Sequence, residues 1–445
     1  MTKSDKRGNP VSYFSQPAID RLDKIFDLLH AYQADPLAEV DKIIAEHPDF
    51  ALAHAFRAGA LATATDKAFE PAIRKSVAFA EALAPQANER ERLHIAAGRA
   101  WLDGDWERAA GCWGRASIDY PGDLLALQLA HVTDFFLGHS HMLRDRVARV
   151  LPHWGPNMPG HGFVKGMYAF GLEESGDYAQ AEDCGRQAIA LNQQDGWAVH
   201  AVAHVMEMQG RAREGADFLH ESADGWAPNS MFAYHLWWHK ALLHLDTNDA
   251  PAALNLYDEK IAAAGFGQAL ELLDGSALLW RLWLLGHDVG DRWKDLAGKW
   301  ETRIDDAYYA FNDVHAMMAF IATDRIDAQN RLLAAAKRAA NGQGTNAMMS
   351  REVGVPACEG FAAFGRGDYA KAIELLGPVR GKANRFGGSH AQRDMFSWTL
   401  TEAAVRLGDR AVAEAFIAER LSWKPESPVN RAWGLRAGKL ERGSA

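Results

Sequence analysis

Apolar residues recur along most of this chain at the i, i+3, i+4 and i+7 spacing of amphipathic helices, and alternating β-branched runs are absent. Short turn signatures, most of them a Gly followed by a polar residue, interrupt the pattern every 34 to 44 residues. They begin at Gly104, Gly138, Gly176, Gly210, Asn248, Gly286, Thr323, Gly367 and Gly408. Such intervals match helical-hairpin repeats. The pattern therefore predicts an all-α fold built from pairs of helices.

The first complete repeat resembles a tetratricopeptide repeat in the order of its key residues. Glycine, aromatic, alanine, aromatic, alanine and proline follow one another at Gly104, Trp106, Ala109, Trp113, Ala116 and Pro121. Glycine takes the positive-φ position that ends one helix, and alanine lets the next helix pack closely against it. Because stacked repeats contact only their neighbours, we expect a single superhelical domain of tetratricopeptide-like hairpins over residues 16–435. Flexible tails are expected at 1–15 and 436–445.

Three segments depart from the regular pattern. Residues 155–162, with two prolines, predict an irregular joint, and residues 341–355, rich in Gly and polar side chains, predict a longer loop. The apolar segment from Arg410 to Trp433 is either a cap on the exposed end of the stack or the surface of a homodimer.

Composition limits which binding partners and which cellular compartment we expect. The 445 residues carry a formal net charge of −10, which repels nucleic acid and anionic lipid, so neither nucleic acid nor a membrane is an expected partner. No apolar segment follows the polar residues 1–12 or is long enough to cross a bilayer. The three cysteines are scattered outside any C-x-x-C motif, so we expect a cytoplasmic protein.

Longer strings of the sequence are more particular than the turns. They run from Trp197 to Arg211, from His235 to His244 and from Phe311 to Phe320, with Gly388 to Asp394 further on. With these strings the chain resembles bacterial members of the tetratricopeptide repeat protein 38 family, over roughly Ala84 to Trp433. The resemblance implies a right-handed α-solenoid and no established activity.

Six histidines fall in segments that precede turns, which the repeat pattern assigns to the first helix of each hairpin. They are His200, His204, His235, His239, His315 and His390. First helices line the concave side of such a stack, so we expect the six imidazoles to share one pocket. The alternative is that each ring only hydrogen-bonds a neighbouring helix.

Two H-x-x-x-H pairs, His200 with His204 and His235 with His239, place imidazoles one helical turn apart on one face. This is the spacing that a single metal ion requires of a helix, and zinc, iron or manganese would fit. The pattern establishes no cofactor, and a divalent transition metal is the candidate. The zincin motif is absent, because Val205 follows His204.

Other polar residues complete a candidate catalytic set. Glu207 lies three residues after His204 and could supply an oxygen ligand or a general base. His390 and Asp394 are one turn apart and predict an acid/base pair, with His315 as a further catalytic candidate. Contacts to a ligand are expected from Trp238, Trp280, Asn312, Asp313 and Arg393. The alternative assigns the tryptophans to the core and the charges to helix surfaces.

Three functions remain open from the sequence. The leading hypothesis is a solenoid that binds a small molecule or a short peptide in a pocket lined by His and Trp. The second is a metal-assisted or His/Asp-assisted hydrolase that acts on a small polar substrate. The third is a protein-interaction scaffold. Serine-hydrolase, P-loop and dinucleotide-binding motifs are missing, so those enzyme classes are not predicted.

Overall fold

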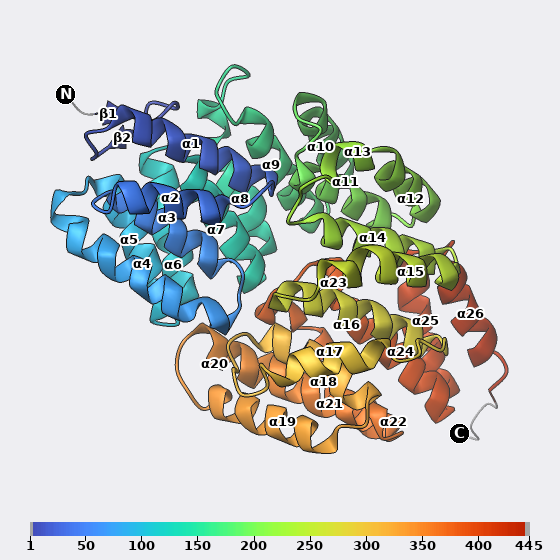
Figure 1. Cartoon of the computed structure of the whole chain (residues 1–445). Coiled ribbons are helices and arrows are strands. Elements are labelled where there is room, and N and C mark those ends of the chain that lie inside the picture. Colours follow the sequence, from blue (N-terminus) through green and yellow to red (C-terminus); the bar gives the residue numbers. More distant parts are fainter. Residues whose placement is uncertain (1–2, 441–445) are drawn as a thin grey trace. The chain divides into compact units, whose positions relative to one another are not determined.

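Helices form nearly all of the regular structure in the computed structural model, which describes residues 3–440 (Figure 1). The strands within these residues are β1 (Lys3–Ser4) and β2 (Pro10–Val11), which pair antiparallel. The all-α prediction is therefore confirmed.

The described residues divide into two compact units, and the division falls within helix α11. Unit 1 comprises residues 1–202 and 222–233, and unit 2 comprises residues 203–221 and 234–445. The single superhelical domain stays a prediction. The helices that begin in unit 1 are α1 (Gln16–Ala31), α2 (Pro36–Glu46), α3 (Ala51–Ala62), α4 (Glu70–Leu83), α5 (Glu89–Leu102), α6 (Trp106–Asp119), α7 (Leu124–Leu137), α8 (Ser140–Val150), α9 (His161–Glu174), α10 (Tyr178–Leu191), α11 (Gly196–Met208), α13 (Ala223–Trp226) and α14 (Ala233–Asp246).

Unit 2 takes the end of α11, all but the first residue of α14, and the remaining helices. These are α12 (Ala212–Glu221), α15 (Ala250–Leu256), α16 (Ala269–Leu284), α17 (Arg292–Glu301), α18 (Ala310–Ala322), α19 (Ile326–Ala340), α20 (Thr345–Met349), α21 (Val355–Gly365), α22 (Tyr369–Arg380), α23 (His390–Arg393), α24 (Met395–Leu407), α25 (Arg410–Trp423) and α26 (Pro428–Ala437). Short 3₁₀ or π segments are η1 (Lys67–Phe69), η2 (Ala84–Gln86), η3 (Leu151–His153), η4 (Tyr257–Ile261), η5 (Ala262–Ala264), η6 (Ser350–Gly354) and η7 (Ala383–Phe386).

Each of the nine predicted turns contains a residue with left-handed backbone. The nine residues are Gly104, Gly138, Gly176, Gly210, Asn248, Gly286, Asp324, Gly367 and Gly408. Seven are glycines, which adopt this conformation without steric cost, and the other two are of the residue types that tolerate it best. The predicted positions of the turns are confirmed.

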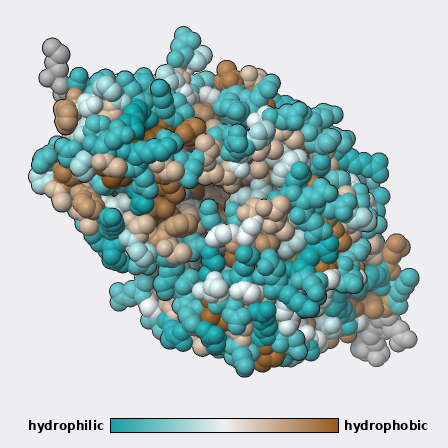
Figure 2. All heavy atoms as spheres, in the orientation of Figure 1, coloured by the Kyte–Doolittle hydropathy of each residue, from teal (hydrophilic) through white to brown (hydrophobic). Residues whose placement is uncertain are grey.

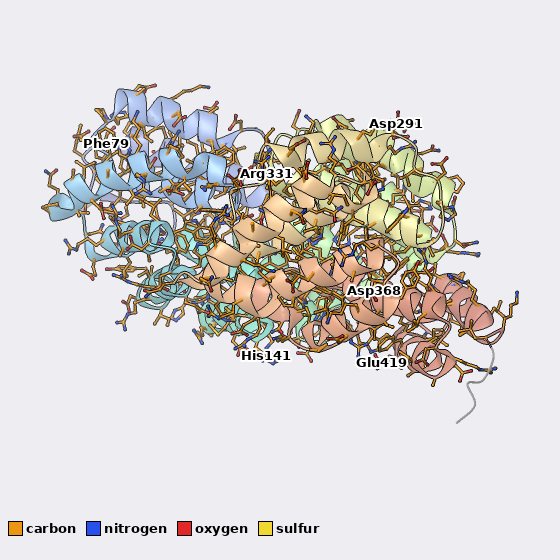
Figure 3. The ribbon with its side chains drawn as sticks, turned by 90° about the horizontal axis from the view of Figure 1, so that it is seen from below. Phe79, His141, Asp291, Arg331, Asp368 and Glu419 are labelled. Carbon is orange, nitrogen blue, oxygen red and sulfur yellow. The ribbon has the colours of Figure 1, made fainter. Side chains whose placement is uncertain are left out.

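The Asp that follows several of these turns begins the next helix. Asp105, Asp249, Asp368 (labelled in Figure 3) and Asp409 each accept a hydrogen bond from the backbone N–H three residues on, at 3.0 to 3.1 Å. A side-chain oxygen in this position satisfies an N–H group that the first helical turn leaves without a partner. In the Gly–Asp signature, the glycine therefore ends one helix and the aspartate caps the N-terminus of the next.

The two helices of a pair differ in burial. On α7, which precedes a turn, nearly every residue from Leu124 to Leu137 is buried. On α8, which follows the same turn, burial is confined to Leu143, Arg146, Val147 and Val150. A helix that is apolar on all sides belongs inside a fold, and a one-sided helix covers it. Polar residues on the first helices therefore lie in the interior.

The segment predicted to be an N-terminal tail, residues 1–15, contains the β1–β2 hairpin from Lys3 onward. The carboxylate of Asp5 accepts hydrogen bonds from the backbone N–H of Arg7 at 3.0 Å and of Asn9 at 2.9 Å. The buried guanidinium of Arg90 donates to the carbonyl of Pro10 at 3.0 Å. Polar contacts, which the hydrophobic pattern does not report, attach this segment to the helices of unit 1.

The second predicted loop, residues 341–355, is largely helical, since it contains α20 and η6. Asn346 accounts for this order, because its amide donates to the carbonyl of Ala307 at 2.6 Å and accepts from the N–H of Ala310 at 2.8 Å. The expectation of a loop there was wrong. The irregular joint is confirmed for residues 155–160, which form no helix, and α9 begins at His161.

The C-terminal helices have both buried and exposed apolar side chains. Trp433 on α26 is buried and donates its indole N–H to Glu402 at 2.8 Å, whereas Trp423 at the end of α25 is 60% exposed. The buried part packs within unit 2, and both the cap and the homodimer stay predictions. Residues 441–445 of the predicted C-terminal tail lie outside the described residues.

Hydrophilic side chains cover most of the molecular face drawn in Figure 2. Exposed large apolar side chains include Phe79 on α4, which is 48% exposed (Figure 3). Among the described residues, no helix combines the length and the apolar composition needed to span a bilayer.

Candidate metal centre

Three helices of unit 2 carry a group of buried histidines and carboxylates. The last part of α11 supplies Glu207, α14 supplies His235 and His239, and α16 supplies Asp274. His235 and His239 lie one turn apart, so both rings leave the same side of α14, as their spacing predicts. All four side chains are buried.

These four residues form one continuous chain of polar contacts. Nδ1 of His235 lies 2.7 Å from Oδ2 of Asp274, and Nδ1 of His239 lies 3.1 Å from Oε2 of Glu207. Between the two imidazoles, the Nε2 atoms face each other at 3.2 Å. Each ring is thus held at Nδ1 by a carboxylate and turned toward the other ring at Nε2.

This arrangement sets the protonation of both rings. An ionised carboxylate only accepts hydrogen bonds, so each Nδ1 carries a proton, and a ring that is neutral presents a lone pair at Nε2. Two lone pairs at this distance repel unless a positive species lies between them. Two nitrogens bound to one zinc ion at about 2.0–2.1 Å in tetrahedral geometry stand about 3.3 Å apart. The observed 3.2 Å separation matches that of two ligands of one ion, and it is also the length of an N–H···N hydrogen bond between the two rings.

The carboxylates on Nδ1 strengthen this interpretation. Metal-binding histidines almost always donate the other ring N–H to a carboxylate or a carbonyl, which fixes the tautomer and raises ligand basicity. Burial holds the pKa of His239 well below its ordinary value, and the positive charges of Arg281 and Lys424 act in the same direction. His239 is therefore neutral, which is the form that binds metal ions.

Two buried cations lie near the chain of contacts. Nζ of Lys424 is 2.7 Å from Oδ2 of Asp246 and 3.9 Å from Oε1 of Glu207. Arg281, whose pKa burial lowers, donates to the carbonyls of Ala277 at 2.9 Å and Ala391 at 2.6 Å. If the imidazoles are neutral, the formal charge of this region is −1. It is the sum of the two cations and the three carboxylates of Asp246, Glu207 and Asp274. This local charge favours an added cation.

The other predicted ligands, His204 and His200, are one turn apart on α11 but belong to different units. The ring of His204 lies 4.4 Å from that of His239 in unit 2, between ring centroids. His200 lies in unit 1, where the rings of Phe170 and Trp197 are both 5.0 Å away and Phe232 is 5.3 Å away. Unit 2 thus brings three of the four predicted ligands close together.

Two further predictions concern residues in contact with these histidines. Glu207 contacts Nδ1 of His239, so its place is to orient that ring, and a role as general base stays a prediction. Trp238 is fully buried and stacks on His235, with ring centroids 5.3 Å apart and planes 17° apart. Its indole supports the imidazole instead of lining an open groove.

The structure does not place His390 on a first helix. His390 begins the four-residue helix α23, and its Nδ1 lies 3.4 Å from the guanidinium of Arg393. Asp394 accepts hydrogen bonds from Arg420 at 2.7 and 3.1 Å and from the indole of Trp398 at 2.9 Å. Despite burial, which raises it, the pKa of Asp394 is lowered to about 2 by Arg420, with smaller effects of Lys424 and Arg281. The His390–Asp394 acid/base pair stays a prediction, and Asp394 is already engaged in an ion pair.

Three predicted residues lie on α18, where all are buried. Nδ1 of His315 is 2.8 Å from the carbonyl of Phe311, and burial lowers the pKa of His315 to about 3. Burial, with a smaller effect of Asp306, raises the pKa of Asp313 to about 7. Asn312 is 8% exposed. The ligand-binding and catalytic roles of these residues stay predictions.

The remaining predicted ligand contacts bind neighbouring elements. Trp280 is buried and donates its indole N–H to Oγ1 of Thr399 at 3.0 Å. Arg393 donates to the carbonyl of Gly388. The contact of Trp280 joins α16 to α24, whereas that of Arg393 joins α23 to the loop that precedes it.

Sequence reasoning missed Asp274, Asp246 and Lys424. A signal was available for Asp274, which interrupts the apolar run from Leu272 to Leu284 on α16. A carboxylate inside such a run is buried only with a partner. No comparable signal marks Lys424, which lies between α25 and α26.

No protein-family model matches the sequence.

Proposed function

We propose that this protein binds a divalent transition metal ion, with zinc the best fit, between Nε2 of His235 and Nε2 of His239. The observation that carries the proposal is the 3.2 Å separation of these atoms while both Nδ1 atoms lie against carboxylates. The ring of His204 lies beside that of His239, with centroids 4.4 Å apart. Asp274 and Glu207 are the outer carboxylates that orient the ligands.

A zinc ion held by His235 and His239 would supply a bound water, whose pKa it would lower toward neutrality. The activity that we propose for the metal-loaded protein is therefore hydrolysis of a small polar substrate. The binding hypothesis built on six histidines lacks one of its members, because His390 lies outside the first helices.

The test is the metal content of the purified chain. We expect about one transition metal ion per chain after growth with added zinc, iron and manganese, measured by elemental analysis. His235→Gln and His239→Gln should each remove the ion. His244→Gln is the matched control, because His244 lies on the same helix and its side chain is 23% exposed. It should retain the ion.

A proton shared by the two Nε2 atoms would produce the same separation. In that case the wild-type chain would contain no stoichiometric metal, and isothermal titration with zinc would show no binding that depends on His239. That result would overturn the proposal. Circular dichroism of each variant separates loss of metal from loss of fold, and hydrolysis of a panel of small esters and amides should require both metal and His239.

Three finer predictions also remain proposals. They are the right-handed solenoid of tetratricopeptide-like hairpins, the relationship to the tetratricopeptide repeat protein 38 family and the cytoplasmic location. The nine left-handed turn residues support the first two. The free thiols of Cys112, Cys184 and Cys358 support the third.

A further inference from the structure

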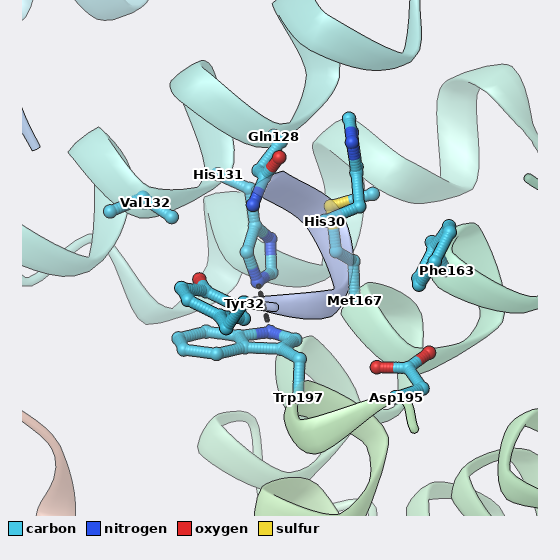
Figure 4. A pocket seen from close by; sticks show the side chains of 9 residues that line it. All are labelled: His30, Tyr32, Gln128, His131, Val132, Phe163, Met167, Asp195 and Trp197. Atoms are coloured by element: carbon cyan, nitrogen blue, oxygen red, sulfur yellow. Dashed lines mark hydrogen bonds between the residues drawn. The ribbon is translucent and has the colours of Figure 1, made fainter. Parts of the chain in front are cut away.

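Unit 1 contains a small cavity that none of the predicted site residues lines. Its walls come from α1 and the residue after it, from α7, from α9 and from the start of α11. The lining residues are His30, Tyr32, Gln128, His131, Val132, Phe163, Met167, Asp195 and Trp197 (Figure 4). The empty space among them, including the part that is open to solvent, is about 240 Å³. Its enclosed part has room for a group about the size of one water molecule.

Asp195 is the residue in this wall that needs explanation. It is 1% exposed, and its Oδ1 accepts a hydrogen bond from the backbone N–H of Ala198 at 3.0 Å. That bond caps α11 and occupies one oxygen. The other oxygen, Oδ2, is buried and has no hydrogen-bond partner among the described residues. A carboxylate out of water is costly unless a cation or a donor meets it.

A second acceptor lies in the same wall. Oε1 of Gln128 is buried and likewise lacks a hydrogen-bond partner within the described part of the chain. Gln128 is 6% exposed and lies on α7, while Asp195 precedes α11. Two acceptors without donors, contributed by different elements, call for a ligand that donates.

The rest of the lining suits a positive charge. The rings of Tyr32 and Trp197 lie together on one side of the cavity, with centroids 5.7 Å apart, and the Asp195 carboxylate lies on the other (Figure 4). The indole N–H of Trp197 is bound to Nε2 of His131 at 3.2 Å, which fixes the ring. None of the nine lining residues is Lys or Arg. Aromatic faces attract cations, and here no protein cation competes for the carboxylate.

We propose that this cavity binds the protonated head group of a small primary amine, with Oδ2 of Asp195 and Oε1 of Gln128 accepting its N–H groups. An –NH₃⁺ group has the size of the enclosed space and offers three donors. Tyr32 and Phe163 are the partly exposed members of the wall, so the rest of the amine would leave the cavity beside them. This site is independent of the metal proposed in unit 2.

The experiment compares methylammonium with methanol, a neutral molecule with the same number of heavy atoms. Ligand-observed NMR at about pH 8 is suitable, because burial raises the pKa of Asp195 to about 7 and the carboxylate must be ionised. We expect millimolar affinity for methylammonium, given its two heavy atoms, tighter binding of butylamine, and no binding of methanol.

Two variants test the site itself. Asp195→Asn removes the charge but keeps an oxygen that can cap α11, and it should weaken amine binding at least about tenfold. Gly166→Ala should weaken it as well, because the added Cβ would lie 2.9 Å from Oδ2 of Asp195. Asp105→Asn makes the same chemical change at the cap of α6 and should leave binding unchanged.

Circular dichroism and thermal unfolding confirm that each variant is folded. Equal binding of methylammonium and methanol, no amine binding at all, or full affinity in folded Asp195→Asn would each overturn the proposal. The second outcome would assign the cavity to water, and the third would place the amine at another site.

Discussion

Trp197 donates its indole N–H to Nε2 of His131 at 3.2 Å, across 66 residues of sequence. Because an indole only donates, Nε2 of His131 must accept, and the proton of the neutral imidazole is on Nδ1. Burial, aided by Arg146 and opposed by a backbone contact from Leu143, lowers the pKa of His131 to about 3. The ring is therefore neutral in the folded protein at all moderate pH values.

This pair predicts part of the acid sensitivity of unit 1. In the unfolded chain a histidine titrates at about 6.5, so His131 stabilises the fold fully above that pH. The contribution is lost as the pH falls from about 6.5 toward 3. When the pH is lowered from about 7 to 4.5, the free energy of unfolding should fall by roughly 2–3 kcal/mol less in His131→Gln than in the wild type. The reason is that glutamine carries no titrating group.

Urea unfolding followed by circular dichroism at several pH values measures this difference. His153→Gln is the control, since His153 is exposed in η3. If His131→Gln and the wild type lost the same stability on acidification, His131 would not be a buried neutral ring.

Asp274 should matter for metal binding without touching the ion. Its carboxylate holds Nδ1 of His235 at 2.7 Å, so Asp274→Asn leaves a weaker acceptor of the same shape. We expect zinc affinity to fall by about 10- to 100-fold while the helical content stays unchanged. Competition with a chromophoric chelator gives the dissociation constants. Asp249→Asn, a change at the cap of α15 in the same unit, should have no effect on affinity.

Local chemistry explains which features could be predicted from the sequence. The turn at Gly367 and Asp368 depends on two adjacent residues. Gly367 adopts the left-handed backbone that ends one helix, and Asp368 caps the start of the next. The pairing of His235 with His239 follows from helical geometry alone. Both depend only on residues within a few positions of each other.

The features that could not be predicted depend on how helices rotate and meet. The spacing of His390 and Asp394 predicted a pair, but Arg420, 26 residues further on, takes the carboxylate. Asp274 reaches His235 from a helix 39 residues away. Such contacts are set by packing between helices, which hydrophobic periodicity does not encode.

Asp195 should make stability depend on pH in the direction opposite to His131. Burial, opposed by backbone hydrogen bonds from Ala198 and Trp197, raises the pKa of Asp195 to about 7 from an ordinary value of 3.8. As the pH rises, Asp195 ionises in the unfolded chain before it ionises in the folded protein. Its contribution to the stability of the fold is therefore present below about pH 4 and is lost between about pH 4 and pH 7.

The other titratable groups of the cavity do not change charge as the pH rises through 7. Burial lowers the pKa of His30 to about 4 and of His131 to about 3, and raises the pKa of Tyr32. As the pH rises from about 4 to 7 without ligand, the free energy of unfolding of Asp195→Asn should therefore increase by roughly 3–4 kcal/mol relative to that of the wild type. Urea unfolding across this range tests the sign, and a parallel pH dependence of the two proteins would contradict it.

Gly171 on α9 allows α8 to approach closely, and its replacement tests that packing. A Cβ added at Gly171 would lie 2.4 Å from the carbonyl carbon of Leu143 and from the N of Arg144, both backbone atoms of α8. Backbone cannot rotate away as a flexible side chain can, so the two helices would have to separate. We expect Gly171→Ala to destabilise unit 1 by at least about 2 kcal/mol.

The matched control is Gly111→Ala on α6, where a new Cβ would meet no atom within 4 Å. Alanine is the better helix former, so this variant should be more stable than the wild type by about 0.5–1 kcal/mol. Thermal unfolding by circular dichroism compares the two, and the same substitution should shift the midpoint in opposite directions. A higher midpoint for both variants would mean that α8 and α9 do not pack at this distance, and that the role assigned to small residues in these helix pairs is wrong.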